Sequence, residues 1–333
     1  MDKKKLNILK YSASAALAAA LLWFSFRGIE WDHFKKGLAS CDWQYVLLSV
    51  LIGMYSFWIR GRRWRETLLP IDPSTSRLTT LNAVNISYIV NMIVPRGGEL
   101  VRCGIVTRHS ARDAGGQKLA SFDKVLGTVL VDRVWDTIVM LLIFAGMFFA
   151  FRDDWGSLLK ANSGGVNFSS TAVLLGIAGL LLLFGGICYF FHGKNRFLGR
   201  IWNFVKGILT GAKESLKMPS PGRFLMLTVL LWLSYWGTSA TILLSLNGAD
   251  LGFEGLGALD ALFLMSVGSI SSIIPVPGGF GAYHYIITLS LSALYGIPTE
   301  TGLIFAVLSH ESQAIGQILC GGASYISETV RKK

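Results

Sequence analysis

Apolar residues lie along this chain in long unbroken blocks, without the alternation of a half-buried strand or the narrow stripe of a soluble helix. A helix needs about 20 apolar residues to cross a hydrocarbon core of roughly 30 Å. With 52% hydrophobic and only 15% charged residues, the 333-residue chain does not have the composition of a soluble domain. The pattern predicts an all-α polytopic membrane protein with six spans. These lie near residues 8–26, 43–60, 125–150, 170–191, 223–246 and 302–326.

Two further apolar segments are interrupted by proline and glycine. Residues 78–94 carry several Asn and Thr side chains and run into VPRGGE, and a short helical piece follows to about Thr107. Residues 258–274 run into PVPGGFG, and a second short piece ends near Tyr295. Non-helical backbone at membrane depth persists only where protein or a water-filled cavity satisfies its polar groups. Each segment is therefore predicted to be a re-entrant hairpin with its tip inside the membrane.

Basic residues are concentrated in the loops on one side of this arrangement. The chain holds 31 Lys and Arg against 20 Asp and Glu, a formal net charge of +11. With six crossings and two re-entrant hairpins, most of the Lys and Arg fall in loops that share a side with both termini, and cytoplasmic loops carry such an excess. We therefore expect a multi-pass protein of the cell membrane with both termini in the cytoplasm. Basic loops facing anionic lipid headgroups account for the charge, so nucleic acid is not expected as a partner.

The two interrupted segments resemble each other. IVPRGG around Pro95 corresponds to IIPVPGG around Pro275, with one residue inserted. The offset of 180 residues between Pro95 and Pro275 also aligns the block at 43–60 with the block at 223–246. Each half then has three spans and one hairpin, and the odd number of spans makes the repeat inverted. One membrane domain is expected over residues 1–333, with pseudo-repeats over about 1–165 and 166–333.

Three smaller features complete the pattern. Residues 31–43 and 196–217 mix aromatic and basic side chains, as helices lying in a membrane interface do, although a solvated connector has a similar composition. The first block lacks a small-residue cleavage site behind it, which favours a retained span over a signal peptide. The four cysteines form no CxxC pair, so small apolar residues are favoured over a zinc site or disulfides. No metal or cofactor is expected.

The proline–glycine breaks are the first candidate site. A helix that begins after Pro-Gly-Gly presents amides without intrahelical partners and the positive end of its dipole, which together attract an anion. Broken helices in inverted repeats build the central binding site of many transporters. The break residues that we expect to bind substrate are Arg96, Gly97 and Gly98 in the first hairpin, and Pro277, Gly278, Gly279 and Gly281 in the second.

Charged residues at the first break extend this site. A charge facing lipid at mid-depth costs about 2.5–3.5 kcal/mol on insertion scales, so Arg96, Glu99 and Arg102 should face a cavity. The planar guanidinium of Arg96 suits a phosphate group. The alternative is an ion pair between Arg96 and Glu99 that closes the hairpin. Arg102 is included as a substrate ligand, the alternative being a place at the cytoplasmic interface.

Acidic residues inside a predicted span are candidates for a proton or ion relay. VLVDRVWD places Asp132 and Asp136 on one helical face, and Arg133 lies three residues before Asp136 and can pair with it. Such a pair would serve either packing or function. Asp132 is then the acid without an obvious partner.

Histidines are a second candidate for the relay. His310 adjoins Glu311 on the last span, and His284, which we include in the substrate site, follows the second break. An intramembrane carboxylate or histidine is a candidate for proton transfer. The alternative is that these histidines are simply hydrogen-bonded in a packed bundle.

With these residues the chain resembles, over nearly its whole length, the flippase-like transmembrane domain of bacterial lysylphosphatidylglycerol synthases and their stand-alone relatives. The family usually has one more residue between the proline and glutamate of the first motif, Glu at the position of Asp132, and Glu at the position of His284. The motifs that carry the resemblance are Pro-Arg-Gly-Glu…Arg (Pro95, Arg96, Gly98, Glu99, Arg102), acid-Arg-x-x-Asp (Asp132, Arg133, Asp136) and PGGxG (Pro277, Gly278, Gly279, Gly281).

The resemblance implies a transporter, flippase or scramblase that moves an anionic, aminoacyl or polyprenyl-linked lipid between leaflets. In the synthases a separate C-terminal domain performs aminoacyl transfer. This chain ends at SETVRKK, so that activity is not expected and the protein is predicted not to be an enzyme. One alternative is an intramembrane enzyme acting on a lipid phosphate or prenyl diphosphate, which DRVWD favours. The other is a membrane partner subunit of a lipid- or glycan-modifying enzyme. A membrane lipid is the expected partner, and a homo-oligomer or a partner enzyme would be compatible.

Overall fold

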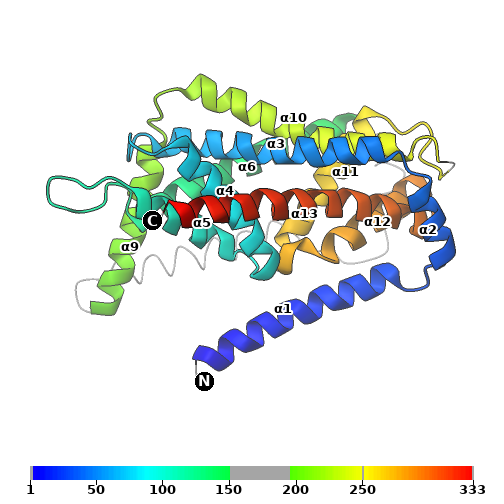
Figure 1. Ribbon diagram of the computed structural model, residues 1–333, viewed down its shortest axis with the longest axis horizontal. Helices are drawn as coiled ribbons and strands as arrows, with labels where there is room; N and C mark the ends of the chain where they lie inside the picture. Colours follow the sequence, from blue (N-terminus) through cyan, green and yellow to red (C-terminus); the bar gives the residue numbers. More distant parts are fainter. Residues whose placement is uncertain (1–2, 151–195, 250, 332–333) are drawn as a thin grey trace.

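A computed structural model describes residues 3–150, 196–249 and 251–331, with side chains for 14–147, 202–249 and 251–331. Every named element in these ranges is a helix (Figure 1). The predicted span at 170–191 lies outside the described residues. The helices are α1 (Lys3–Phe26), α2 (Trp31–Ala39), α3 (Trp43–Leu68), α4 (Arg77–Ile93), α5 (Gly97–His109), α6 (Phe122–Ala150), α9 (Arg196–Ser215), α10 (Pro221–Leu246), α11 (Ala258–Ile270), the 3₁₀ turns η1 (Ser271–Ile273) and η2 (Pro277–Gly279), α12 (Ala282–Tyr295) and α13 (Thr299–Val330).

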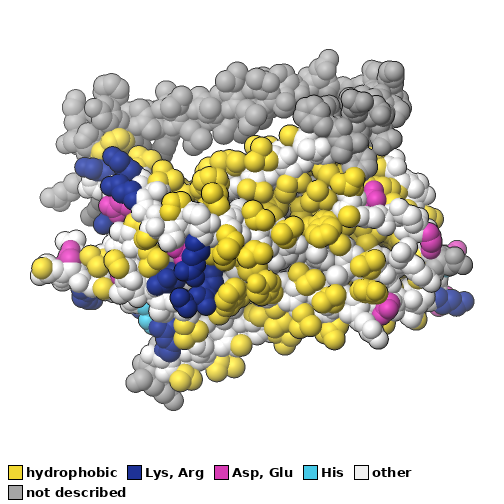
Figure 2. Space-filling view, turned by 90° about the horizontal axis from the view of Figure 1, so that it is seen from above, with side chains coloured by type: hydrophobic (Ala, Val, Ile, Leu, Met, Phe, Trp, Pro, Cys, Tyr) yellow, Lys and Arg dark blue, Asp and Glu magenta, His cyan; other side chains and the backbone are white. Residues whose placement is uncertain are grey.

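The long apolar helices fit a membrane protein. Among the described residues, α10 and α13 are long and apolar enough to cross a membrane, and α2 with α3 adds a third span if that pair, bent by 79°, is counted as one. Large apolar side chains face outward on neighbouring helices, among them Leu51 and Trp58 on α3 and Val229 and Leu233 on α10. Figure 2 shows a broad apolar surface with Lys and Arg gathered toward one end. An exposed apolar belt of this kind is suited to contact with lipid.

The order of elements occurs twice along the chain. A long helix, two shorter helices joined through a proline–glycine break, and another long helix follow one another as α3 to α6 and again as α10 to α13. The amphipathic segments form α2 and α9, each before one of these series, and Figure 1 shows them at opposite ends of the bundle. The helices α3 and α10, which take the same place in the two series, pack along each other.

The first hairpin, α4 with α5, is closed by a close approach of two backbones. A Cβ added at Gly98 would lie 2.1 Å from the carbonyl oxygen of Ser87, so only glycine fits there. The polar residues of α4 have partners on α13: Asn82 donates to Glu328 at 2.9 Å, and Asn85 donates to Ser324 at 3.0 Å. These bonds explain why an apolar segment tolerates several amide side chains.

The second hairpin runs from α11 through η1 and η2 to α12, and α1 packs on its break. Ala18 of α1 forms a buried apolar cluster with Val276 and Ala282. Gly281 permits this contact, because a Cβ there would lie 2.7 Å from the carbonyl oxygen of Ala18. Ser14 also donates a hydrogen bond to the carbonyl of Pro275. The N-terminal part of α1 then leaves the bundle (Figure 1).

Candidate functional site

The tips of the two hairpins touch. The guanidinium of Arg96 donates to the carbonyl oxygens of Ser272 at 3.3 Å and Ile273 at 3.5 Å. A Cβ added at Gly278 would lie 3.4 Å from the Cα of Met92. Arg96 has φ +60°, and among the described residues it is the one non-glycine residue with a positive φ. Such a conformation is unusual for an arginine and marks the tip as a functional candidate.

The amides at the tips are less free than the sequence led us to expect. The amide of Gly97 donates to the carbonyl of Val94 at 3.0 Å, and that of Gly98 donates to the side chain of Asn91 at 2.8 Å. At the second hairpin, Gly281 is covered by α1. The expectation that both breaks offer bare amides is therefore wrong for Gly97 and Gly98, whose N–H groups are used to close the first hairpin.

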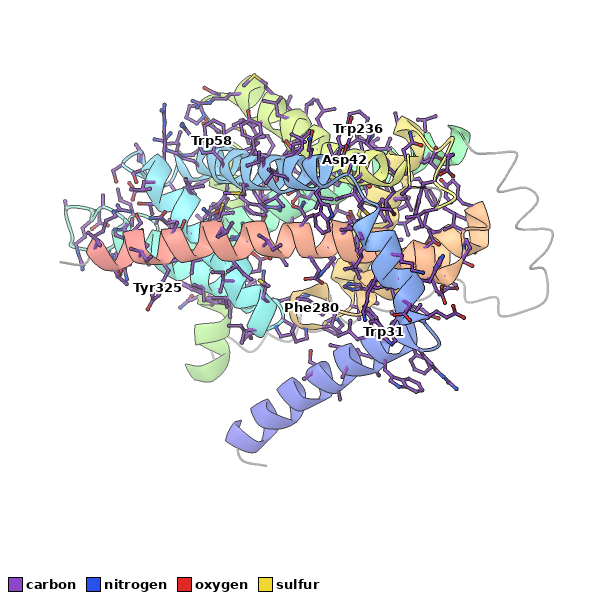
Figure 3. All side chains as sticks on the ribbon, turned by 45° about the vertical axis from the view of Figure 1, so that its right-hand side comes forward. Trp31, Asp42, Trp58, Trp236, Phe280 and Tyr325 are labelled. Carbon is purple, nitrogen blue, oxygen red and sulfur yellow. The ribbon has the colours of Figure 1, made fainter. Side chains whose placement is uncertain are left out.

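A pocket of about 200 Å³ opens beside the second break. Its polar groups come from His310, Gln313 and Gln317 on α13, and its aromatic wall includes Phe280, which lies between α13 and α1 (Figure 3). The ring centroids of Phe280 and His310 are 4.7 Å apart. The lining residues are Met92, Gly278, Phe280, Tyr283, His310, Gln313, Ala314 and Gln317, so both hairpins contribute.

Glu99 and Arg102 of the first hairpin join charged residues of α3 and α6 in one largely buried charge network. Asp132 accepts a hydrogen bond from Arg63 at 2.6 Å and has Arg60 and Arg102 each at 3.7 Å. Asp136 pairs with Arg60 and, at 2.7 Å, with Arg63. Tyr235 on α10 accepts a hydrogen bond from Arg60 at 2.7 Å. The network joins Arg60, Arg63, Glu99, Arg102, Asp132, Arg133 and Asp136.

Three predicted pairings are corrected by this network. Glu99 pairs with Arg102 at 2.9 Å and with Arg133, so the alternative of an Arg96–Glu99 ion pair is wrong. Arg133 pairs with Glu99 rather than with Asp136, because Asp136 faces α3. Asp132, expected to lack a partner, is fully buried among arginines.

Three arginines also lie deeper in the protein than the sequence led us to expect. Arg102 is buried, with its guanidinium 4.7 Å from the ring of Trp64, and does not lie at an exposed interface. The predicted span 43–60 would leave Arg60 at its end and Arg63 in the following cytoplasmic loop, whereas α3 continues to Leu68 and buries both. Their spacing of three residues, beside Trp64, puts them on one helical face and was the available signal.

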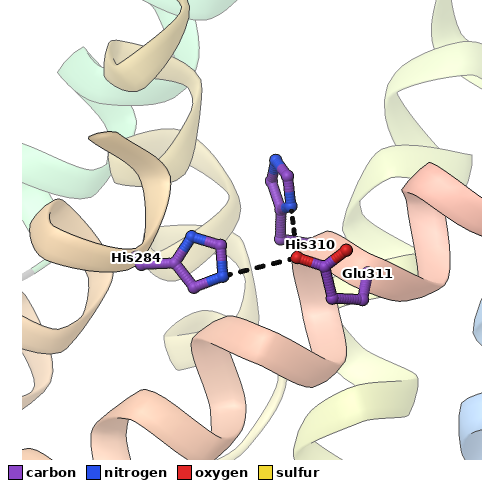
Figure 4. A group of neighbouring side chains, drawn as sticks. All are labelled: His284, His310 and Glu311. Atoms are coloured by element: carbon purple, nitrogen blue, oxygen red, sulfur yellow. Dashed lines mark hydrogen bonds and ion pairs between the residues drawn. The ribbon is translucent and has the colours of Figure 1, made fainter. Parts of the chain in front are cut away.

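The histidines form a separate group beside the pocket. Glu311 lies 3.1 Å from Nδ1 of His310 and 3.6 Å from Nε2 of His284 (Figure 4). The other ring nitrogen of His310 lies 3.0 Å from the carbonyl oxygen of Gly278. This histidine cluster, His284, His310 and Glu311, connects α12 and α13 at the second break. The structure therefore brings together the residues of the predicted sites in two groups, one at each hairpin.

Long outward-facing apolar helices, two touching hairpins and a buried charge network define a helical membrane protein with a polar site at helix breaks. Residues 11–321 match the family model described as the lysylphosphatidylglycerol synthase TM region. The chain belongs to this family, which confirms the resemblance seen in the sequence motifs. No solved structure matches the chain.

Two curated relatives match this chain over only part of their own length. The glycosyltransferase AglD of Haloferax volcanii is 24% identical over 319 residues, which cover 88% of this chain and 50% of AglD. The UPF0104 membrane protein PH1989 of Pyrococcus horikoshii is 28% identical over 129 residues, 38% of this chain and 35% of that protein. The chain thus matches half or less of the length of each.

Proposed function

We propose that this protein moves an anionic lipid, either a phospholipid or a polyprenyl phosphate, between the leaflets of the cell membrane. The observation that carries the proposal is the charge network, in which four arginines face three carboxylates. Nη1 of Arg63 and Nη2 of Arg102 are buried there without a hydrogen-bond partner. Four arginines against three carboxylates leave one positive charge unbalanced, at the edge of the network where Arg133 is half-exposed, and an anionic headgroup would neutralise it.

The headgroup would enter where the network reaches the surface. The side chain of Arg133 is 49% exposed and that of Glu99 21%, whereas Arg63 and Asp132 are fully buried. Arg96, three residues before Glu99, is exposed, and its bonds to backbone carbonyls are long. We infer that Arg96 exchanges these weak bonds for a charge-assisted bond to phosphate, while the acyl chains stay against the apolar outer surface.

The topology of the proposal is six spans and two re-entrant hairpins in an inverted repeat, with both termini in the cytoplasm. The repeated order of elements and the contact between the hairpin tips support it. Rocking of the two halves would expose the site to each leaflet in turn, as in other inverted-repeat transporters. In this proposal Asp132, Asp136, His310 and Glu311 are the groups that would couple the movement to protons.

Reconstitution into liposomes tests this function. We expect the protein to expose fluorescent phosphatidylglycerol on the inner leaflet to dithionite, and Arg96→Ala to lose most of that rate. Arg112→Ala is the matched control, since Arg112 is an exposed arginine in the loop after α5. Equal rates for Arg96→Ala and the wild type would contradict the role given to Arg96. A wild type that moves neither phosphatidylglycerol nor a polyprenyl phosphate would contradict the function itself.

The match to half of AglD favours one second candidate, a membrane subunit that works with a glycan-modifying enzyme. Co-purification of such an enzyme with the tagged protein would support it. The intramembrane enzyme is less well supported, because both carboxylates of DRVWD are paired with arginines and are not free to hold a metal ion.

A further inference from the structure

We propose that His284, His310 and Glu311 form a binding site for a divalent transition-metal ion, for which Zn²⁺ is the best match. The three ligand atoms lie within 4.8 Å of one another. In a tetrahedral zinc site with bonds of 2.0–2.1 Å, neighbouring ligand atoms are about 3.3 Å apart. The distances from Glu311 to His310 (3.1 Å) and to His284 (3.6 Å) are already close to that separation.

The hydrogen bond of His310 to Gly278 supports a cation at the other ring nitrogen. A carbonyl oxygen only accepts, so Nε2 of His310, 3.0 Å away, carries the proton. In a neutral ring, Nδ1 then directs a lone pair at a carboxylate oxygen of Glu311 3.1 Å away. Two lone pairs at this distance repel, so either a proton or a metal ion must lie between them. A second-shell bond from the distal nitrogen to a backbone carbonyl is the usual support of a metal-binding histidine.

His284 provides the second independent observation. The residue is 1% exposed, and its ring packs near Phe26 of α1, with ring centroids 6.2 Å apart. The Nδ1 atom is buried without a hydrogen-bond partner, while Nε2 faces Glu311. A buried imidazole with so few polar contacts is expensive unless its other nitrogen makes a strong interaction. Coordination of a metal ion at Nε2 would supply that interaction.

The ligand set selects among metals, and the surroundings allow access. Two imidazoles and one carboxylate suit Zn²⁺, whereas Mg²⁺ and Ca²⁺ prefer oxygen ligands throughout. The side chain of Glu311 is 40% exposed, so an ion can reach the cluster. Three protein ligands leave a coordination position open. Because His310 also lines the pocket, a water or a phosphate oxygen bound there would be near the ion.

Metal binding by the full-length protein tests the proposal without any transport assay. After removal of the affinity tag and treatment with a chelator, titration with Zn²⁺ alone should give one tightly bound ion per chain by calorimetry and by metal analysis. His284→Gln and His310→Gln should each weaken binding at least about 100-fold, since even second-shell changes cost 10–100-fold. His33→Gln is the matched control, because His33 also pairs with a glutamate, Glu300, at 3.2 Å.

Two further measurements keep the test decisive. Co²⁺ bound at this site should give visible absorption bands of a tetrahedral site, and these bands should be absent from Glu311→Gln, a substitution of nearly equal size at a half-buried side chain. Size-exclusion profiles in detergent check that each variant is folded. A wild type that binds no Zn²⁺, or histidine variants that bind it as tightly as His33→Gln, would overturn the proposal. Binding of Zn²⁺ by a protein that moves no lipid would leave the metal site established and the proposed function refuted.

Discussion

Asp132 on α6 accepts a hydrogen bond from Arg63 on α3 at 2.6 Å, and both side chains are fully buried. Removing one partner of a buried ion pair leaves an uncompensated charge, which costs about 3–5 kcal/mol. We therefore expect Asp132→Ala to lower the melting temperature in detergent strongly. Glu300→Gln removes the surface pair with His33 and should cost less than about 1 kcal/mol. Similar melting temperatures for the two variants would show that the charge network does not stabilise the fold.

The first hairpin depends on Gly98, and Gly104 on the same helix provides a matched comparison. A Cβ at Gly98 would lie 2.1 Å from the carbonyl oxygen of Ser87, whereas at Gly104 on the same helix it would meet nothing within 4 Å. Gly98→Ala should destabilise the protein by about 1–3 kcal/mol or more, because backbone must shift. Gly104→Ala should be neutral or stabilise by up to about 1 kcal/mol, because alanine favours helix. The melting temperatures of the two variants measure this difference in stability. Equal melting temperatures would mean that the backbones at Gly98 and Ser87 are not in close contact.

Much of the helix pattern could be predicted because it depends on local hydrophobicity and on proline and glycine. The break predicted after residues 258–274 lies where η1 ends at Ile273, and the amphipathic segment predicted at 196–217 is α9, Arg196–Ser215. The PGG motif is where the second hairpin turns, with Gly278 at φ +60°. These features are set by residues adjacent in sequence.

The pairing of charges could not be predicted, because it depends on contacts between distant segments. Arg60 and Arg63 look like loop residues in sequence, since nothing nearby shows that Asp132 and Asp136 will lie beside them. Arg133 has an acid three residues away, yet it pairs with Glu99 on another helix. That His284 would lie beside His310 and Glu311 could not be predicted for the same reason, because these residues come from two helices.

Asp72, in the loop between α3 and α4, gives a prediction for acid pH. Burial raises the pKa of this carboxyl group, but hydrogen bonds from Ser74, Ser110 and the amide of Ala111 outweigh that effect and hold the pKa below its ordinary value. A lowered pKa stabilises the fold above the pKa of the unfolded chain, about 3.9. This contribution is lost as the pH falls through that value toward the lowered pKa.

Replacing Asp72 with asparagine tests the direction of this pKa shift. The melting temperature of the wild type should exceed that of Asp72→Asn near neutral pH, and the difference should shrink as the pH is lowered below about 4. Glu254→Gln, at an exposed loop residue, controls for general charge effects and should give a difference that does not change in this way. A gap between wild type and Asp72→Asn that widens on acidification would refute the assignment.

The proposed topology makes a prediction for labelling from outside the cell. Lys206 lies on α9 and Glu254 in the loop between α10 and α11, and Figure 1 shows α9 and this loop at opposite ends of the bundle. Because basic residues concentrate in cytoplasmic loops, the end with α9 should face the cytoplasm. In a chain whose four native cysteines have been replaced, Glu254→Cys should react with a membrane-impermeant maleimide on intact cells and Lys206→Cys should not. Both should react once the cells are opened, which controls for reactivity. Labelling of position 206 but not 254 on intact cells would reverse the orientation, and labelling of both would mean that the number of crossings between them is even.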